Sequence, residues 1–278
     1  MYLRVIFLSL TFAAFFAPVS AWAQATHGQN PNLVRIPGGT FLMGTHSGGN
    51  DNERPVRMVT ISGFYMSRHP VTQGEWFDVV GSNPSHFQGG RLAAGVNWRN
   101  LPVENVSWFD AVEFANWKSI WAGLEPAYTI TGTGANRTVV WNREANGYRL
   151  PTEAEWEFAA RGGDRTPGHF IFSGSDTADE VAWHQGNSGG RTHEVGRLRP
   201  NALGLYDMSG NVSEWVYDRF GPYPSAAQTN PTGPAAGVSR VARGGGWNLP
   251  PGNARSAIRR VVNPVNRYTF IGFRVVRP

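Results

Sequence analysis

Residues 204–215 read Gly-Leu-Tyr-Asp-Met-Ser-Gly-Asn-Val-Ser-Glu-Trp, and this stretch decides the fold. It gathers the side-chain oxygens of Asp207, Asn211 and Glu214 within eight residues. Its two glycines allow tight curvature, because glycine takes left-handed backbone conformations at little steric cost. Calcium binds about six to eight oxygen ligands, which such a loop can supply. The stretch therefore predicts a cation-binding loop, and a polar turn between two strands is the alternative that the spacing leaves open.

The same stretch resembles the signature of the formylglycine-generating enzyme family, also called the sulfatase-modifying-factor domain. Other segments match the family's motifs in the family's order: residues 36–44, 102–108, 148–157, 243–248 and 271–274. The resemblance runs from about residue 34 to the C-terminus. It implies a C-type-lectin-like fold that is rich in loops and poor in regular secondary structure.

Local patterns indicate helices and several short strands. Capping boxes, in which a Ser or Thr and an acidic residue three positions later bond each other's backbone amides, start at Thr72, Ser107 and Thr152. Residues 129–142 have the pattern of a β-hairpin around a glycine-containing turn. A few helices combined with many short strands indicate an α+β fold.

Helical periodicity also predicts which side chains are buried. It places Val80 on the buried stripe of the first helix and Ile120 on that of the second. Glu153, Glu155 and Glu157, at the start of the third helix, are expected to be caps and surface charges. No second carboxylate can be placed near them from the sequence, so no acid–base pair is predicted.

Residues 1–23 are identified as a signal peptide. Arg4 is the positive charge, residues 5–19 are almost wholly apolar, and small residues precede Gln24. We expect residues 24–278 to form a single domain of the sulfatase-modifying-factor type. The mature protein is expected to be secreted or periplasmic, with no membrane span after the signal peptide is removed.

The composition narrows the possible chemistry. The chain has 278 residues, no cysteine and a net charge of +5. The absence of cysteine excludes thiolate nucleophiles, thiolate metal ligands and disulfides. The basic residues are scattered and form no nucleic-acid-binding motif, so no nucleic-acid partner is expected.

The resemblance implies a structural calcium ion. In the family, the loop that corresponds to residues 204–215 binds calcium through two side chains and two backbone carbonyls. Carried over position by position, the side chains are those of Asp207 and Glu214, and the carbonyls are those of Gly210 and Val212. The alternative is a structural loop that holds no ion.

The oxidase chemistry of the family is not expected here. Formylglycine-generating members hold copper(I) with two cysteines, and this chain has Leu249 and approximately Pro251 at those positions. A second branch, of sulfoxide synthases, holds iron with three histidines, and the histidines of this chain lack the required spacing. No copper or iron site is recognised and the catalytic residues are unknown. If the chain is an enzyme, we expect an oxidoreductase or a maturation factor.

A polar group near the C-terminus corresponds to the substrate cleft of the family. Arginine binds carboxylate and phosphate through two parallel hydrogen bonds, so a peptide-like or anionic ligand is expected. The alternative is that Arg255 and Arg259 form structural ion pairs that tie loops together. The candidate substrate-binding residues are Trp247, Asn248, Asn253, Arg255, Arg259 and Arg260.

Two functions are compatible with these features. The first is an exported maturation or oxidoreductase factor, which acts on a peptide-like or anionic substrate or on an exported protein and is not a sulfatase-activating oxidase. The second is a non-enzymatic, C-type-lectin-like ligand-binding module, because Tyr268, Thr269 and Phe270 fall in the region that varies among such proteins. The retained cleft and the signal peptide favour the first.

Overall fold

In the computed structural model, which describes residues 32–46, 48–163 and 170–278, the predicted helices begin at the predicted caps. The hydroxyls of Thr72, Ser107 and Thr152 each accept a hydrogen bond of 3.1 Å from the amide three positions later. The box at Thr72 is incomplete, because the carboxylate of Glu75 binds Lys118 Nζ at 2.5 Å. The helices are α1 (Gln73–Val80), α2 (Trp108–Trp121), α3 (Glu153–Ala160) and the short α4 (Ala178–Val181).

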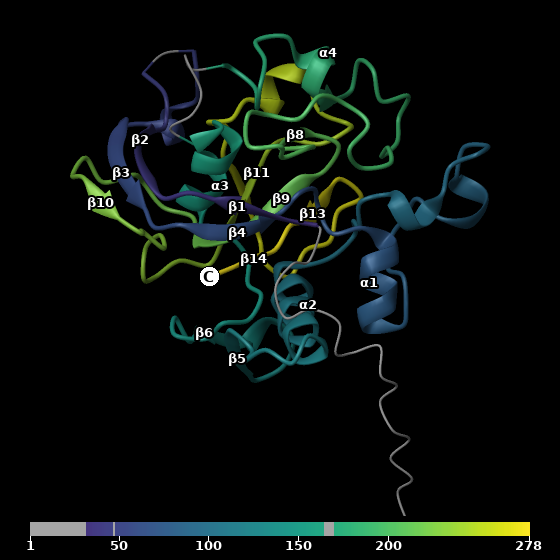
Figure 1. Ribbon diagram of the computed structural model, residues 1–278, viewed down its shortest axis with the longest axis horizontal. Helices are drawn as coiled ribbons and strands as arrows, with labels where there is room; N and C mark the ends of the chain where they lie inside the picture. The colour runs from purple at the N-terminus through teal and green to yellow at the C-terminus, as the bar shows by residue number, and fades with distance from the viewer. Residues whose placement is uncertain (1–31, 47, 164–169) are drawn as a thin grey trace, which may run out of the picture. The chain divides into compact units, whose positions relative to one another are not determined.

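Within the described residues, short strands form three sheets and two isolated pairs (Figure 1). The four-stranded sheet has the order β12 (Arg260–Val262), β11 (Arg240–Arg243), β9 (Ser213–Arg219), β13 (Ile271–Phe273). Strands β9 and β13 are parallel, and the other neighbours in this sheet are antiparallel.

The remaining strands are shorter or lie in smaller sheets. One sheet has the order β1 (Leu33–Ile36), β4 (Phe64–Ser67), β14 (Val276–Arg277), and the other has β10 (Gln228–Thr229), β3 (Arg57–Ile61), β2 (Gly39–Met43). The pairs are β5 (Tyr128–Thr131) with β6 (Thr138–Trp141), which is the predicted hairpin, and β7 (Ala182–Trp183) with β8 (Ser209–Gly210). This mixture of short helices and strands is the predicted α+β architecture.

Strand β9 lies between two buried apolar clusters. Successive side chains of a strand point to opposite faces, so Trp215 packs in the cluster around α2 and Val216 in the cluster around α3. The Trp215 indole donates to the carbonyl of Val106 at 3.0 Å, and the Trp108 indole donates to the carbonyl of Val216 at 2.8 Å. Helix α3 contacts β2, β3, β9 and β11 (Figure 1). Trp215, which ends the predicted cation-binding stretch at residues 204–215, therefore lies in the core.

Three burial predictions were wrong, those for Val80, for Ile120 and for the glutamates of α3. Val80 is 43% exposed and Ile120 is 63% exposed. On α2 the buried face includes Val112, Ala115 and Ser119, and Ile120 points about 100° away from its neighbour because a helix turns once in about 3.6 residues. Helix α3 is buried at every position, so its three glutamates are not surface charges.

Two sequence predictions concern membranes and export. Across residues 32–46, 48–163 and 170–278, no helix combines the length and the apolar composition needed to cross a membrane. The predicted signal peptide at residues 1–23 lies outside the described residues and stays a prediction.

Candidate functional site

The loop at residues 204–215 has the tight curvature that its sequence predicts. Asp207, Gly210 and Asn211 have positive φ angles of 55°, 75° and 61°. A Cβ atom at Gly210 would lie 2.4 Å from the carbonyl oxygen of Trp183, so glycine is required there. The side-chain amide of Asn211 accepts a hydrogen bond from the backbone amide of His193 and donates one to the carbonyl of His193, both at 3.0 Å. These contacts hold the loop against the segment that precedes it.

Asp207 is a buried carboxyl group whose oxygens accept only neutral donors. They accept from the amide of Gly196 at 2.7 Å and from the Asn211 side chain at 3.3 Å. Within the described part of the chain, no basic side chain forms an ion pair with Asp207. Burial raises the pKa of Asp207 above its ordinary value, and the two hydrogen bonds oppose that rise. A cation beside this group would stabilise its charged form.

Glu214 is buried and already has a cationic partner. The Arg274 guanidinium donates to both carboxylate oxygens, each at 2.7 Å, and the Trp156 indole donates to one of them at 2.8 Å. Arg274 also donates to the carbonyl of Tyr206 at 2.9 Å, so it fastens both ends of the loop. A calcium ion bound by Glu214 would have to share this carboxylate with Arg274.

The residues therefore fit a calcium ion in part. The four predicted contributors, Asp207, Gly210, Val212 and Glu214, are all buried in this loop. Asp207 forms no ion pair among the described residues, although the charges of Arg274 and His69 act on it, whereas Glu214 is paired with Arg274. No group of three or more His, Asp or Glu side chains that could hold a metal occurs in the described residues. Calcium binding stays a prediction, with Asp207 as its strongest side-chain ligand.

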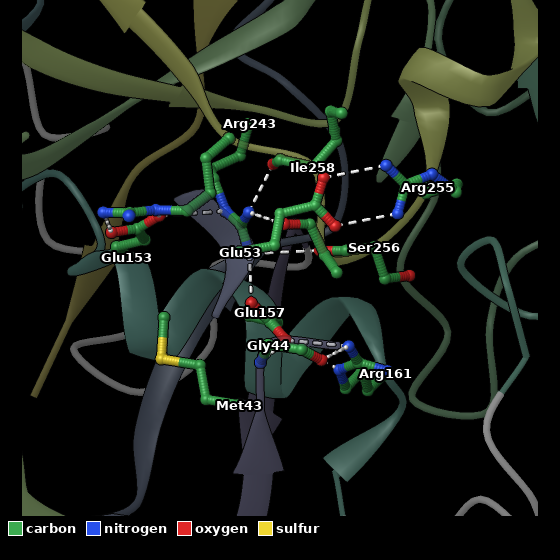
Figure 2. Close-up of polar contacts among 12 residues, drawn as sticks. Met43, Gly44, Glu53, Glu153, Glu157, Arg161, Arg243, Arg255, Ser256 and Ile258 are labelled. Carbon is green, nitrogen blue, oxygen red and sulfur yellow. Dashed lines mark hydrogen bonds and ion pairs between the residues drawn. The ribbon is translucent and has the colours of Figure 1, made fainter. Parts of the chain in front are cut away.

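A second buried polar network joins α3 to the segment after β11 (Figure 2). Arg243 is fully buried and binds the carboxylate of Glu157. It also donates to the carbonyls of Ser256, Ala257 and Ile258. Such a set satisfies most donors of the guanidinium, which is the condition for burying its charge without a large desolvation cost.

Glu157 is the acidic centre of this network. Its carboxylate accepts from the amide of Gly44 at 2.9 Å and from Arg161 at 2.9 Å, in addition to Arg243. Burial would raise the pKa of Glu157, but Arg161 and Arg243 outweigh it and hold the pKa below its usual value. Glu157 is therefore charged and structural, and the sequence reading of it as a surface charge was wrong.

Arg255 and Arg259, which were candidates for ligand binding, also bind buried glutamates. Arg255 donates twice to Glu53, both at 2.8 Å (Figure 2), and Arg259 donates twice to Glu153, at 2.6 and 2.8 Å. These are the loop-tying ion pairs that the sequence left open as the alternative. An anionic ligand at either arginine would have to displace a buried carboxylate, which is unfavourable because the displaced charge would lose its partner.

Asp218 adds an acid that sequence reasoning did not identify. Its carboxyl oxygen accepts from the amide of Glu153 at 2.8 Å. Burial, followed by the negative charge of Glu153, raises the pKa of Asp218 to about 8. Two carboxyl groups this close in a buried site do not both ionise easily. The sequence did not indicate that Glu153 is close to Asp218, because the two residues are 65 positions apart.

Trp247 lies in a half-buried aromatic group. Its indole donates to the carbonyl of Thr269 at 2.9 Å, and its ring meets Phe87 edge to face with 5.3 Å between centroids. Arg260 lies over the ring of Phe270, so Trp247 and Arg260 both contact residues 268–270. The structure thus brings these two predicted residues to one segment.

The two predicted asparagines differ in their contacts. The buried Oδ1 atom of Asn248 has no hydrogen-bond partner in the described part of the chain. Asn253 lies in the short turn Pro251–Ala254, and its backbone amide donates to Pro250 at 2.9 Å. Asn248 is therefore the better placed of the two to bind a ligand through its side chain.

Glu104 joins the Trp247 group and was missed from the sequence. One of its oxygens accepts from the amide of Phe87 at 3.0 Å, and the other is buried without a partner among the described residues. Burial raises the pKa of Glu104 to about 7, against the lowering effect of the backbone hydrogen bonds. The signal was present as a single acid that directly follows Val103 and precedes Val106 by two positions, in a matched family segment.

The chain belongs to a known family. The sulfatase-modifying factor enzyme 1-like domain matches residues 19–278. The chaperone protein LppX of Paenibacillus barcinonensis is 36% identical over 271 residues, which are 87% of each chain. These findings confirm the predicted family, and the lack of cysteine excludes the cysteine-dependent copper oxidation of formylglycine-generating enzymes.

Solved structures confirm the C-type-lectin-like fold of the formylglycine-generating-enzyme type. The Treponema denticola variable protein 1 has a TM-score of 0.81 and 33% identity, and the match covers 88% of this chain and 95% of that one. The structure of CarF has a TM-score of 0.69 and 30% identity, over 88% of this chain and 97% of that one. The short strands and the connecting loops described above are therefore the family's architecture.

Proposed function

We propose that this protein is an exported maturation factor that binds a polypeptide or peptide-like substrate. The observation that carries the proposal is the similarity to a chaperone protein over 87% of both chains. Because thiol chemistry is excluded, maturation by binding is favoured over maturation by oxidation. The proposal includes export directed by residues 1–23 and the calcium ion discussed above.

The Trp247 group supports a peptide-like ligand. Trp247, Tyr268 and Phe270 are half-buried and lie together, and aromatic rings supply large contact areas at low conformational cost. The unpaired Oδ1 atom of Asn248 can accept a hydrogen bond from a peptide amide. Glu104, whose pKa is near 7, can serve as donor or acceptor in the same group. Arg255 and Arg259 are left out of this ligand site because they hold loops together.

A non-enzymatic ligand-binding module is the second candidate. It is favoured by the similarity to a variable protein, at a TM-score of 0.81. Residues 268–270 lie beside Trp247, since the Trp247 indole donates to the carbonyl of Thr269. Substitutions in this segment would alter the ligand surface while the core around Trp215 is kept.

The test is a gene deletion complemented with three forms of the chain: the unchanged protein, Trp247→Ala, and the control Trp121→Ala. Trp121 is an exposed tryptophan on α2. Exported proteins are measured by quantitative mass spectrometry with limited proteolysis, and exported metabolites are compared in parallel. We expect at least one exported protein or product to be lost or misfolded in the deletion and restored by the control variant, but not by a folded Trp247→Ala protein.

The outcomes separate the two candidates. A deletion that leaves all exported proteins and metabolites unchanged contradicts the maturation factor. The same unchanged profile, together with saturable binding of a ligand that is lost in Trp247→Ala, favours the binding module. The melting temperature of each purified variant shows whether a loss of function follows from unfolding.

A further inference from the structure

A recess of about 350 Å³ is lined by no residue of the Trp247 group or of the Arg243 network. It opens between the first turn of α2, strand β6 and the adjoining ends of β9 and β11, which contribute Phe109, Val139, Arg219 and Arg240. Arg137 also lines it, and the described residues of its wall include no aspartate or glutamate. Two of these arginines, Arg219 and Arg240, form no ion pair among the described residues, and they give the recess a positive character.

Arg240 is 7% exposed and forms no ion pair within the described residues. Its guanidinium lies 3.6 Å from the centre of the Trp108 ring and donates to the carbonyl of Tyr217 at 2.5 Å. Burial, followed by the positive charge of Arg219, lowers the pKa of Arg240 to about 10. A buried cation that lacks a counter-ion is costly, so the site favours the arrival of an anion.

Arg219 and Arg137 complete the basic wall in different ways. Arg219 donates to the carbonyl of Ala235 at 3.0 Å and has no acidic partner in the described part of the chain. Arg137 is neutralised by Glu113 at 2.6 Å and covers the ring of Phe109. The recess therefore holds two arginines that lack carboxylates and one that already has its own.

One nearby acid does act on Arg240. When ionised, Asp218 raises the pKa of Arg240, but it forms no ion pair or hydrogen bond with Arg240 among the described residues. Its carboxyl oxygen is also occupied by the amide of Glu153. Asp218 therefore does not supply the counter-ion that Arg219 and Arg240 lack.

We propose that this recess binds an organic oxyanion, in which a phosphate, sulfate or carboxylate group contacts Arg219 and Arg240 and an apolar body covers Val139 and Val238. Val238 is 89% exposed, so it offers an apolar surface for such a body. Arginine forks suit oxyanions because they present parallel donors. The inference is independent of the proposed function, because it uses none of the Trp247 group.

Phenyl phosphate is the probe, because it joins an oxyanion to an apolar ring. Its affinity for the purified chain is measured by isothermal titration calorimetry at constant ionic strength, beside inorganic phosphate and benzyl alcohol. We expect phenyl phosphate to bind best of the three. Arg219→Gln should weaken its binding by about tenfold, as the loss of a charge-assisted hydrogen bond predicts. The control Arg35→Gln, which removes an exposed arginine on β1, should change it by less than about twofold.

The apolar part of the site has its own test. Val238→Ala should weaken phenyl phosphate and leave inorganic phosphate unchanged. If Arg219→Gln does not fold, Arg219→Lys keeps the charge and removes the fork, and it should also weaken phenyl phosphate. The proposal is overturned by an absence of saturable binding, or by equal losses in Arg219→Gln and Arg35→Gln, which would show only a general charge effect.

Discussion

The network around Arg243 and the recess around Arg240 place buried arginines in opposite situations. In the network, Arg243 binds Glu157, Arg259 binds Glu153, and backbone carbonyls accept further hydrogen bonds from both arginines. In the recess, Arg219 and Arg240 face each other's charge without an acidic partner in the described residues. The comparison shows that a cluster of arginines in the sequence is not enough to identify a ligand site. The presence or absence of a buried carboxylate beside each arginine distinguishes a structural role from a binding role.

Removing a paired charge should have the largest effect. Glu157→Gln leaves Arg243 and Arg161 without their carboxylate in a buried site, and we expect a loss of about 3–5 kcal/mol in the free energy of unfolding. Asp78→Asn, in the surface pair with Arg99, is the matched control and should cost about 0–1 kcal/mol. Urea denaturation of both variants measures the difference. Equal losses in the free energy of unfolding would show that burial does not make the Glu157 pair more important for stability than the surface pair.

The raised pKa of Asp218 should make stability depend on pH. Its ordinary pKa is 3.8 and its folded value is about 8, so between these values the folded chain keeps a proton that the unfolded chain has lost. Stability should therefore fall as the pH rises through this window, with a contribution of up to about 1.4 kcal/mol per pH unit, and level off above it.

Urea midpoints between pH 5 and pH 9, at about one-unit steps, measure this slope for the unchanged chain and for Asp218→Asn. The variant should show a flatter slope, whereas Asp51→Asn, at an exposed carboxylate, should keep the original one. Glu104 contributes in the same direction between 4.5 and about 7. An identical slope in Asp218→Asn would contradict the raised pKa.

The loop at residues 204–215 repeats the contrast within one segment, because Glu214 is paired with Arg274, whereas Asp207 forms no ion pair among the described residues. We expect calcium to bind beside Asp207. At a concentration a hundredfold above its dissociation constant, it should stabilise the chain by about 2.7 kcal/mol. The melting temperature should rise with calcium and fall with a chelator, and Asp207→Ala should remove both responses. A melting temperature that ignores the chelator would count against the ion.

Removing an unpaired charge should have the smallest effect on stability. Arg219→Gln relieves repulsion with Arg240 and breaks no ion pair among the described residues, so the free energy of unfolding should stay within about 0.5 kcal/mol of the original. Thermal and urea denaturation measure this change. A loss as large as that in Glu157→Gln would end the distinction between the two regions.

Local chemistry made much of the fold predictable. The helix starts at Thr72, Ser107 and Thr152 follow from bonds that span three positions. The hairpin of β5 and β6 and the curvature at Gly210 are similarly local. The buried face of α2 was harder to predict, because the packing partners of Ile120 are not set by the helix itself.

The candidate site was only partly predictable. Trp247 and Arg260 do lie beside one segment, but Arg255 and Arg259 have glutamate partners that are 202 and 106 positions away. Spacing within the chain contains no information about which distant carboxylate a guanidinium meets. Glu104 and Asp218 were missed because burial raises their pKa values, and burial is decided by tertiary packing.

The sequence by itself determined the family, the helix caps, the tight loop and the exclusion of thiol chemistry, because each depends on residue identity or on bonds between near neighbours. Only the tertiary structure decided which arginines are neutralised and which acids stay protonated. The physical reason is that charge pairing and desolvation arise where distant segments pack together, and those contacts form only when the chain has folded.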